Sequence, residues 1–230
     1  MCMDSQLMGK PELDLRCYFV TGQGDDIVER ARAAAAGGAG VIQVRSKPIS
    51  ARDLYTLSRY VAEAVHEVNP KTQVLIDDRV DVALALRDHG IAGVHVGQDD
   101  LDVRVARDLL GPDAIIGLTT GTMELVQAAN AYADVIDYIG CGPFRDTPTK
   151  DSGRPPLGFG GYPPLVEAAQ VPLVAIGDVT VDDAYHLALA GVDGLAIVRG
   201  IMHADNSQDY CERVVAEFER GQTDRAKALP

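Results

Sequence analysis

The sequence predicts an α/β fold, a single-domain (β/α)8 TIM barrel, from two observations. Short apolar runs rich in β-branched residues alternate with amphipathic segments rich in Ala and Leu, a pattern typical of parallel strands joined by helices. Eight such units fit within 230 residues, and about 200 to 250 residues is the usual size of such a barrel. An open doubly wound sheet is the alternative, but GQG at 22–24 is too short for the glycine fingerprint of that fold.

The expected elements follow one another regularly along the chain. Strands are expected at 16–21, 40–45, 73–77, 93–97, 114–118, 135–140, 172–177 and 193–198. Amphipathic helices are expected between them, as at 25–38, 50–68 and 180–192, with Ser50 and Thr180 as N-caps and Gly37 and Gly191 as stops. We expect residues 15–220 to form the barrel, preceded by a polar N-terminal extension at 1–14 and followed by a frayed C-terminal tail at 221–230.

Composition excludes some classes of partner. The chain has 21 Lys and Arg against 34 Asp and Glu, a formal net charge of -13, so nucleic acid and phosphate-rich membrane surfaces are not expected to bind. Binding of a small anion to such an acidic chain would require a site where cationic side chains are concentrated. The four cysteines show no ligand spacing and are expected to be reduced thiols, and no signal or membrane span is visible, which predicts a cytoplasmic protein. The oligomeric state is left open, a homodimer included.

Polar residues gather where the predicted strands end. In a closed barrel all carboxyl ends of the strands meet around one mouth. Alternation along QVRSK places Gln43, Arg45 and Lys47 on one face of the second strand. An unpaired buried charge costs several kcal/mol, so the two inward cations indicate a bound anion.

Carboxylates and a loop complete this predicted anion site. Asp78 and Asp100 follow the third and fourth strands and offer the hard oxygen ligands that Mg²⁺ prefers, so a metal-bound diphosphate would satisfy both carboxylates and cations. The loop after the sixth strand carries Thr147, Thr149 and Lys150, which are interpreted as anion-binding groups. His95 lies within an apolar strand and is interpreted as a satisfied core histidine.

In order along residues 16–203, the motifs QVRSK, DDR, GQDD, TPTK and AIGDV resemble those of the thiamine phosphate synthase family. The resemblance implies a transferase that couples hydroxymethylpyrimidine diphosphate to hydroxyethylthiazole phosphate and releases diphosphate by a dissociative, Mg²⁺-assisted substitution. By this resemblance, Mg²⁺ is held by Asp78 and Asp100, and the diphosphate is held by the catalytic residues Arg45, Lys47 and Lys150. The pyrimidine or its diphosphate is contacted by Gln43 and Thr119, with Asp77 beside them. The thiazole phosphate is received by Thr147, Thr149, Gly177, Val198 and Arg199.

The chain departs from the family pattern at several positions. Asp77 stands where the family usually has Asn, Thr119 stands for the usual Ser without the His that normally lies nearby, and Ser46 replaces a Glu that alternation turns away from the mouth. Asp178 replaces a glycine, and Arg199 replaces a small Ser. Since the seventh and eighth strands are neighbours, our hypothesis is that Arg199 compensates the charge of Asp178, or reaches the phosphate itself. Two alternatives to the synthase stay open: a thiazole tautomerase, and a non-catalytic paralogue that binds a phosphorylated metabolite.

Overall fold

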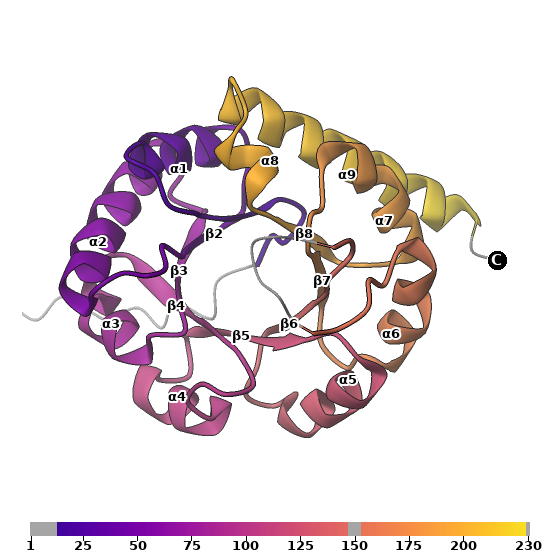
Figure 1. Cartoon of the computed structure of the whole chain (residues 1–230), viewed down its shortest axis with the longest axis horizontal. Coiled ribbons are helices and arrows are strands. Elements are labelled where there is room, and N and C mark those ends of the chain that lie inside the picture. The colour runs from indigo at the N-terminus through magenta and orange to yellow at the C-terminus, as the bar shows by residue number, and fades with distance from the viewer. Residues whose placement is uncertain (1–12, 147–152, 229–230) are drawn as a thin grey trace, which may run out of the picture.

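Eight parallel strands close into a barrel in the order in which they follow one another along the chain (Figure 1). The first strand pairs with both the second and the eighth. The computed structural model describes residues 13–146 and 153–228. The strands are β1 (Tyr18–Val20), β2 (Val41–Val44), β3 (Gln73–Asp77), β4 (Ile91–Val96), β5 (Ile115–Thr120), β6 (Tyr138–Cys141), β7 (Leu173–Ile176) and β8 (Gly194–Ile197). Each overlaps the range expected from the sequence, so the predicted barrel is confirmed.

Helices surround the strands as an outer ring (Figure 1). The α-helices are α1 (Ile27–Ala36), α2 (Ala51–Val68), α3 (Val80–Ala85), α4 (Val103–Leu110), α5 (Met123–Ala129), α6 (Tyr162–Ala168), α7 (Ala184–Ala190), α8 (Arg199–Met202) and α9 (Ser207–Ala228). Short 3-10 turns are η1 (Arg87–His89), η2 (Asn130–Tyr132), η3 (Phe159–Gly161) and η4 (Val181–Asp183).

Local signals in the sequence explain where several helices begin and end. The Ser50 hydroxyl accepts a hydrogen bond from the backbone N–H of Asp53 at 3.1 Å, which caps α2 as predicted. Helix α7 ends at Gly191, whose φ of 95° is easily adopted only by a residue without a Cβ atom. Thr180 precedes the short turn η4, and α7 itself begins only after that turn.

Alternation along the strands separates two cores. In β2, Ile42 and Val44 belong to the cluster between the strands and the helices, whereas Val41 belongs to the cluster inside the barrel and Gln43 lines its pocket. Burying one such aliphatic side chain stabilises the folded state by roughly 1.5 to 3 kcal/mol. This stabilisation determines which side chains of the strand point to each core. The same alternation therefore turns the polar residues of each strand end toward the mouth of the barrel.

Helix α9 runs into the segment that the sequence predicts to be a frayed tail. It packs against α7, α1 and α8 and continues to Ala228, so most of the segment predicted as a frayed tail at 221–230 is helical. The Tyr185 hydroxyl of α7 donates to Asp224 at 3.2 Å, and Lys227 pairs with Asp224 at 3.0 Å. These contacts support the final turns of the helix, although their polar sequence shows little apolar periodicity.

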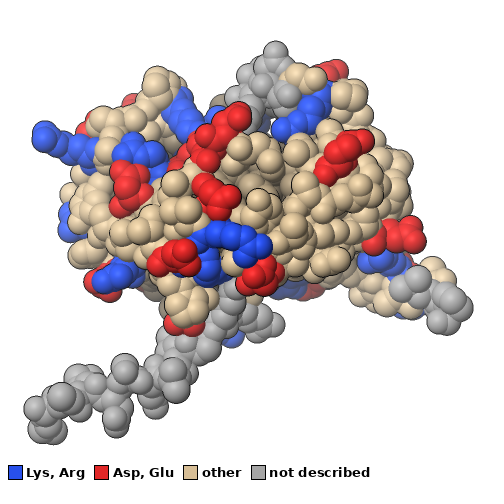
Figure 2. Space-filling model, turned by 90° about the horizontal axis from the view of Figure 1, so that it is seen from below, with Lys and Arg blue, Asp and Glu red and all other residues tan. Residues whose placement is uncertain are grey.

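Charges of both signs are interspersed on the flank of the barrel seen in Figure 2. The excess of acidic residues is therefore not gathered into one patch on this face. Elsewhere among the residues that the structure describes, basic side chains also pair with acidic ones, as Arg32 does with Glu67 at 2.6 Å. Within residues 13–146 and 153–228, no helix combines the length and the apolar composition needed to cross a bilayer.

Candidate active site

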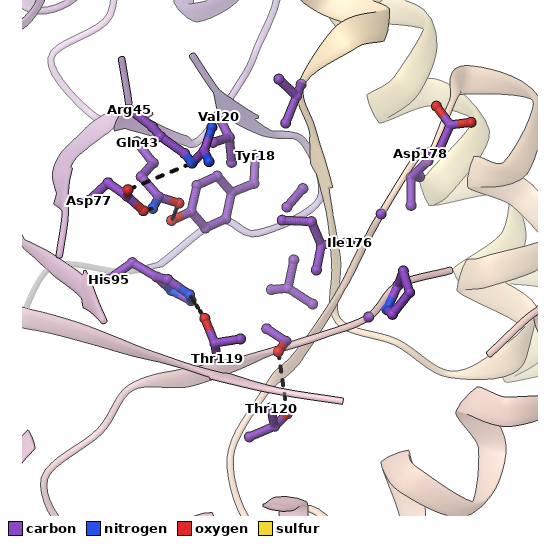
Figure 3. Close-up of a pocket in the computed structure, with 18 of the residues that line it drawn as sticks. Tyr18, Val20, Gln43, Arg45, Asp77, His95, Thr119, Thr120, Ile176 and Asp178 are labelled. Atoms are coloured by element: carbon purple, nitrogen blue, oxygen red, sulfur yellow. Dashed lines mark hydrogen bonds and ion pairs between the residues drawn. The ribbon is translucent and has the colours of Figure 1, made fainter. Parts of the chain in front are cut away.

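A pocket opens inside the barrel and receives side chains from all eight strands or the residues that follow them. The sequence-predicted residues that line it are Gln43, Arg45, Asp77, Thr119, Gly177, Val198 and Arg199. In Figure 3, Gln43, Arg45 and Asp77 lie together on one side, His95 and Thr119 lie below them, and Asp178 lies on the opposite side. The carboxyl-end rule for barrels therefore placed these residues correctly around one cavity.

Two cations and a carboxylate meet at the ends of β2 and β3. The Lys47 ammonium lies 2.7 Å from Asp77 Oδ2, and the Arg45 guanidinium Nε lies 3.7 Å from the same oxygen. Lys47 also contacts Asp78 Oδ2 and so bridges the two carboxylates. Burial by itself lowers the pKa of Lys47, but its hydrogen bonds to Asp77 and Asp78 outweigh burial and raise that pKa. Lys47 is therefore a fixed positive charge at neutral pH.

Asp77 is the buried member of this cluster. Its Oδ1 accepts a 2.5 Å hydrogen bond from the Gln43 amide nitrogen, and only 8% of the residue is exposed. Burial raises the pKa of Asp77 and the neighbouring Asp78 charge adds to that increase, while Lys47 and Arg45 act against it. The two cations therefore stabilise a carboxylate that its surroundings would otherwise disfavour.

Asp78 and Asp100 face each other at the ends of β3 and β4. Asp78 has a left-handed backbone with a φ of 59°, held by the hydrogen bond from its N–H to the His95 carbonyl at 2.8 Å. Asp100 Oδ2 accepts from the Gly97 N–H at 2.7 Å. Burial raises the pKa of Asp100 against the effect of this hydrogen bond, and the Asp78 charge raises it further.

This arrangement suits a divalent cation. Two carboxylates that repel each other beside the Lys47 ammonium match the protein contribution that Mg²⁺ usually takes, namely one or two carboxylates with water and substrate phosphate. In the described part of the chain, no cluster of three or more His, Cys, Asp or Glu side chains is arranged to hold a metal. The donor set thus fits a metal shared with a substrate rather than a metal enclosed by protein ligands.

The ends of β7 and β8 carry a second charged group. The Arg199 Nη2 donates to Asp178 Oδ1 at 2.5 Å, so the predicted pairing of these two residues is confirmed. Asp178 has a φ of 55° and follows Gly177, whose φ is 104°. Arg145 donates to the Asp178 carbonyl at 3.0 Å and to Asp183 Oδ2 at 2.6 Å. Two arginines therefore hold the turn after β7, Arg199 through the Asp178 side chain and Arg145 through the Asp178 carbonyl.

Several residues that line the pocket were not predicted from the sequence. His95, interpreted as a core histidine, does make the hydrogen bonds of a satisfied side chain, but it also lines the pocket together with Tyr18, Tyr138 and Arg154. The period-two alternation within β4 would have indicated the inward face of His95. Nothing local indicates the tyrosines, because each lies within a strand of ordinary apolar composition.

Thr147, Thr149 and Lys150 lie outside the described residues, so their roles stay predictions. Cys141 is near the pocket and contacts the Thr120 hydroxyl at 2.7 Å. Burial raises the pKa of Cys141 to about 11, so this thiol is protonated at neutral pH and is a poor nucleophile.

Comparisons with known proteins agree with one another. The family described as thiamine monophosphate synthase matches residues 17–201. The chain is 69% identical over 208 residues to a thiamine-phosphate synthase of Corynebacterium jeikeium, covering 90% of this chain and 95% of that protein. A thiamine-phosphate synthase of Corynebacterium efficiens is 61% identical over 216 residues, covering 92% and 99%. Among solved structures, a thiamine phosphate pyrophosphorylase from Pyrococcus furiosus matches with a TM-score of 0.77 at 29% identity, covering 90% of this chain and 98% of that one.

Proposed function

Because the chain belongs to the thiamine monophosphate synthase family, we propose that the pocket inside its barrel is where hydroxymethylpyrimidine diphosphate is coupled to hydroxyethylthiazole phosphate. The protein is a transferase that makes thiamine phosphate, as its relatives at 69% and 61% identity are named. The observation that carries the assignment of the site is the convergence of Arg45 and Lys47 with Asp77, Asp78 and Asp100 at three neighbouring strand ends.

We assign the diphosphate to this charged cluster. Arg45 and Lys47 provide positive charge beside the cavity, and Lys150 is predicted from the sequence to add a third cation. Asp78 and Asp100 would hold Mg²⁺. When bound, that ion would act as a Lewis acid and stabilise negative charge on the diphosphate oxygens. The mutual contacts of Lys47, Asp77 and Asp78 keep the charges in place before the substrate arrives, which limits the reorganisation that binding requires.

The proposed reaction is a dissociative substitution that needs no proton transfer. The carbon–oxygen bond between the pyrimidine methylene and the diphosphate breaks, and its electron pair leaves with the diphosphate, whose charge Arg45 and Lys47 stabilise. The thiazole ring nitrogen then donates its lone pair to the methylene carbon and forms the carbon–nitrogen bond. A pocket in which both ring nitrogens of His95 already make hydrogen bonds suits a reaction without a general base.

The thiazole phosphate is assigned to the ends of β7 and β8. Gly177, Val198 and Arg199 line the pocket there, on the side opposite the diphosphate cluster. Thr147 and Thr149 are predicted from the sequence to join them. This placement puts the two substrates on facing sides of one cavity, so that their reacting atoms meet between the two phosphate groups.

The test is an assay of thiamine phosphate formation by the purified chain, with and without Mg²⁺. We expect formation that requires Mg²⁺, stops with a chelator and returns when Mg²⁺ is restored. The variant Lys47→Ala should lower turnover on the order of 10²-fold, whereas Lys71→Ala, at an exposed lysine outside the pocket, should not. Full activity in the presence of chelator would contradict the proposed metal, and equal effects of the two lysine variants would contradict the proposed diphosphate site.

The same assay separates the two alternatives left open by the sequence. A thiazole tautomerase would convert its substrate without consuming the pyrimidine diphosphate. A non-catalytic paralogue would bind phosphorylated compounds without releasing diphosphate. The names of the relatives support the synthase over both.

A further inference from the structure

A continuous chain of hydrogen bonds crosses the inside of the barrel from β3 to β5. Its links are Gln43 Nε2 to Asp77 Oδ1 at 2.5 Å, the Tyr18 hydroxyl to Gln43 Oε1 at 2.9 Å, the Tyr138 hydroxyl to the Tyr18 hydroxyl at 2.7 Å, His95 Nδ1 to the Tyr138 hydroxyl at 2.9 Å, and His95 Nε2 to Thr119 Oγ1 at 2.9 Å. Figure 3 shows its two ends, with Gln43 against Asp77 and His95 against Thr119. We call this chain the relay.

The Asp77 end determines which atom donates in the first two links. Asp77 has no hydrogen to donate, because its ion pairs with Lys47, 2.7 Å from Oδ2, and with Arg45, 3.7 Å from the same oxygen, hold it as a carboxylate. The Gln43 amide must therefore turn its NH₂ group toward Asp77 and its carbonyl oxygen toward Tyr18. That oxygen accepts the single hydroxyl hydrogen of Tyr18.

The two tyrosines continue the same donor-to-acceptor direction of the hydrogen bonds across the barrel. Each phenol has one hydrogen to donate. Since Tyr18 donates to Gln43, the bond between the phenols is donated by Tyr138, and Tyr138 must in turn accept from His95 Nδ1. Tyr18 is 1% exposed and Tyr138 is fully buried, so solvent does not offer these hydroxyls other partners.

We infer that Asp77 is a positioning residue: through the relay it fixes His95 as the neutral tautomer protonated at Nδ1, with Nε2 as the acceptor of the Thr119 hydroxyl hydrogen. The lone pairs of Thr119 Oγ1 are then the part of that hydroxyl available to a ligand. Thr119 can accept from an N–H group on the ring of a substrate, but it has no hydrogen left to donate to a phosphate oxygen. On the proposed function, this selects the pyrimidine ring over its diphosphate as the partner of Thr119.

The isosteric variant Asp77→Asn provides the sharpest test, since it should reverse the relay. Lys47 carries only donors, so it will take the carbonyl oxygen of the new amide and leave the NH₂ group facing Gln43. Gln43 must then flip and donate to Tyr18, which donates to Tyr138, which donates to His95 Nδ1. We therefore expect the His95 proton to move from Nδ1 in the natural protein to Nε2 in Asp77→Asn.

The measurement is ¹⁵N–¹H correlation NMR of histidine-labelled, ligand-free protein, which distinguishes the two neutral tautomers and the imidazolium. The chain has five histidines, and the His95 signals are identified by their loss in His95→Asn. In a Tyr18→Phe background the relay is cut, so adding Asp77→Asn there should leave the His95 tautomer unchanged. A purely structural role of Asp77 would not predict that dependence on Tyr18.

Two results would overturn the inference. One is the finding that His95 of the natural protein is protonated at Nε2 or at both nitrogens. This measurement needs no variant, so it tests the inference even if Asp77→Asn does not fold. The other is a folded Asp77→Asn protein that keeps the Nδ1 proton. Because no substrate is present, a failed relay is distinguishable from a failed assignment of function.

Discussion

Removing Arg199 should weaken binding of the thiazole phosphate more than removing both Arg199 and its partner. In the structure the Arg199 guanidinium neutralises Asp178 at 2.5 Å, and both residues line the pocket. The variant Arg199→Ala leaves a carboxylate at the end of β7 that faces the proposed site of a phosphate dianion. The variant Asp178→Asn removes that charge and keeps a residue type that tolerates the left-handed backbone found at position 178.

The size of the effect follows from the charges. With side chains 27% and 41% exposed, this pair lies near solvent, so a high effective dielectric constant applies. At a separation of about 6 Å and an effective dielectric constant of about 50, two unit charges interact by about 1 kcal/mol, and a phosphate carries between one and two charges. The expected loss is about 1 to 2 kcal/mol, or about 5- to 30-fold in KM for the thiazole phosphate.

Steady-state kinetics at saturating pyrimidine diphosphate measures this loss. We expect Arg199→Ala to raise KM by that factor, Asp178→Asn alone not to raise it, and the double variant to return to within about threefold of the natural protein. Salt should reduce the effect of Arg199→Ala, because screening weakens repulsion between exposed charges. If the double variant is as impaired as Arg199→Ala, repulsion by Asp178 is not the cause, and Arg199 acts by contacting the phosphate directly.

Three further predictions concern the metal, the loop and stability. Asp100→Asn should lower turnover on the order of 10²-fold and raise the Mg²⁺ concentration for half-maximal activity; an unchanged Mg²⁺ dependence would count against Asp100 as a ligand. Lys150→Ala should lower turnover on the order of 10²-fold in a steady-state assay, and near-normal turnover would remove it from the mechanism. Burial acts to raise the pKa of Asp183, but hydrogen bonds from Arg145 and Thr180 outweigh it and lower that pKa. Asp183 therefore stabilises the fold above its unfolded pKa of about 3.9, and this stabilisation is lost as pH falls through the lower folded-state value. Asp183→Asn should cost about 1 to 2 kcal/mol at pH 7 by thermal denaturation and less at pH 3; an equal cost at both pH values would refute the ion pair as the cause.

The charged cluster at the ends of β2 and β3 was largely predictable from local sequence. The period of two in β2 puts Gln43 and Arg45 on the face opposite Ile42 and Val44, and parallel strands in a closed barrel bring their carboxyl ends together. The meeting of Lys47 with the carboxylates after β3 follows from that geometry. The length of the chain and the period of its apolar residues thus predicted the barrel. They also predicted that the charged residues at the ends of β2 and β3 lie close together.

The donor and acceptor roles inside the barrel were decided only by the tertiary structure. Tyr18 and Tyr138 are 120 residues apart and share a hydrogen bond because barrel closure places their strands across one narrow interior. The sequence alone indicated that Asp178 and Arg199 lie on neighbouring strands, but the left-handed backbone at Asp178 sets where its carboxylate points. Periodicity encodes which face a side chain takes, because the pleat is local; the partner it meets on that face depends on the register and curvature of strands distant in the chain.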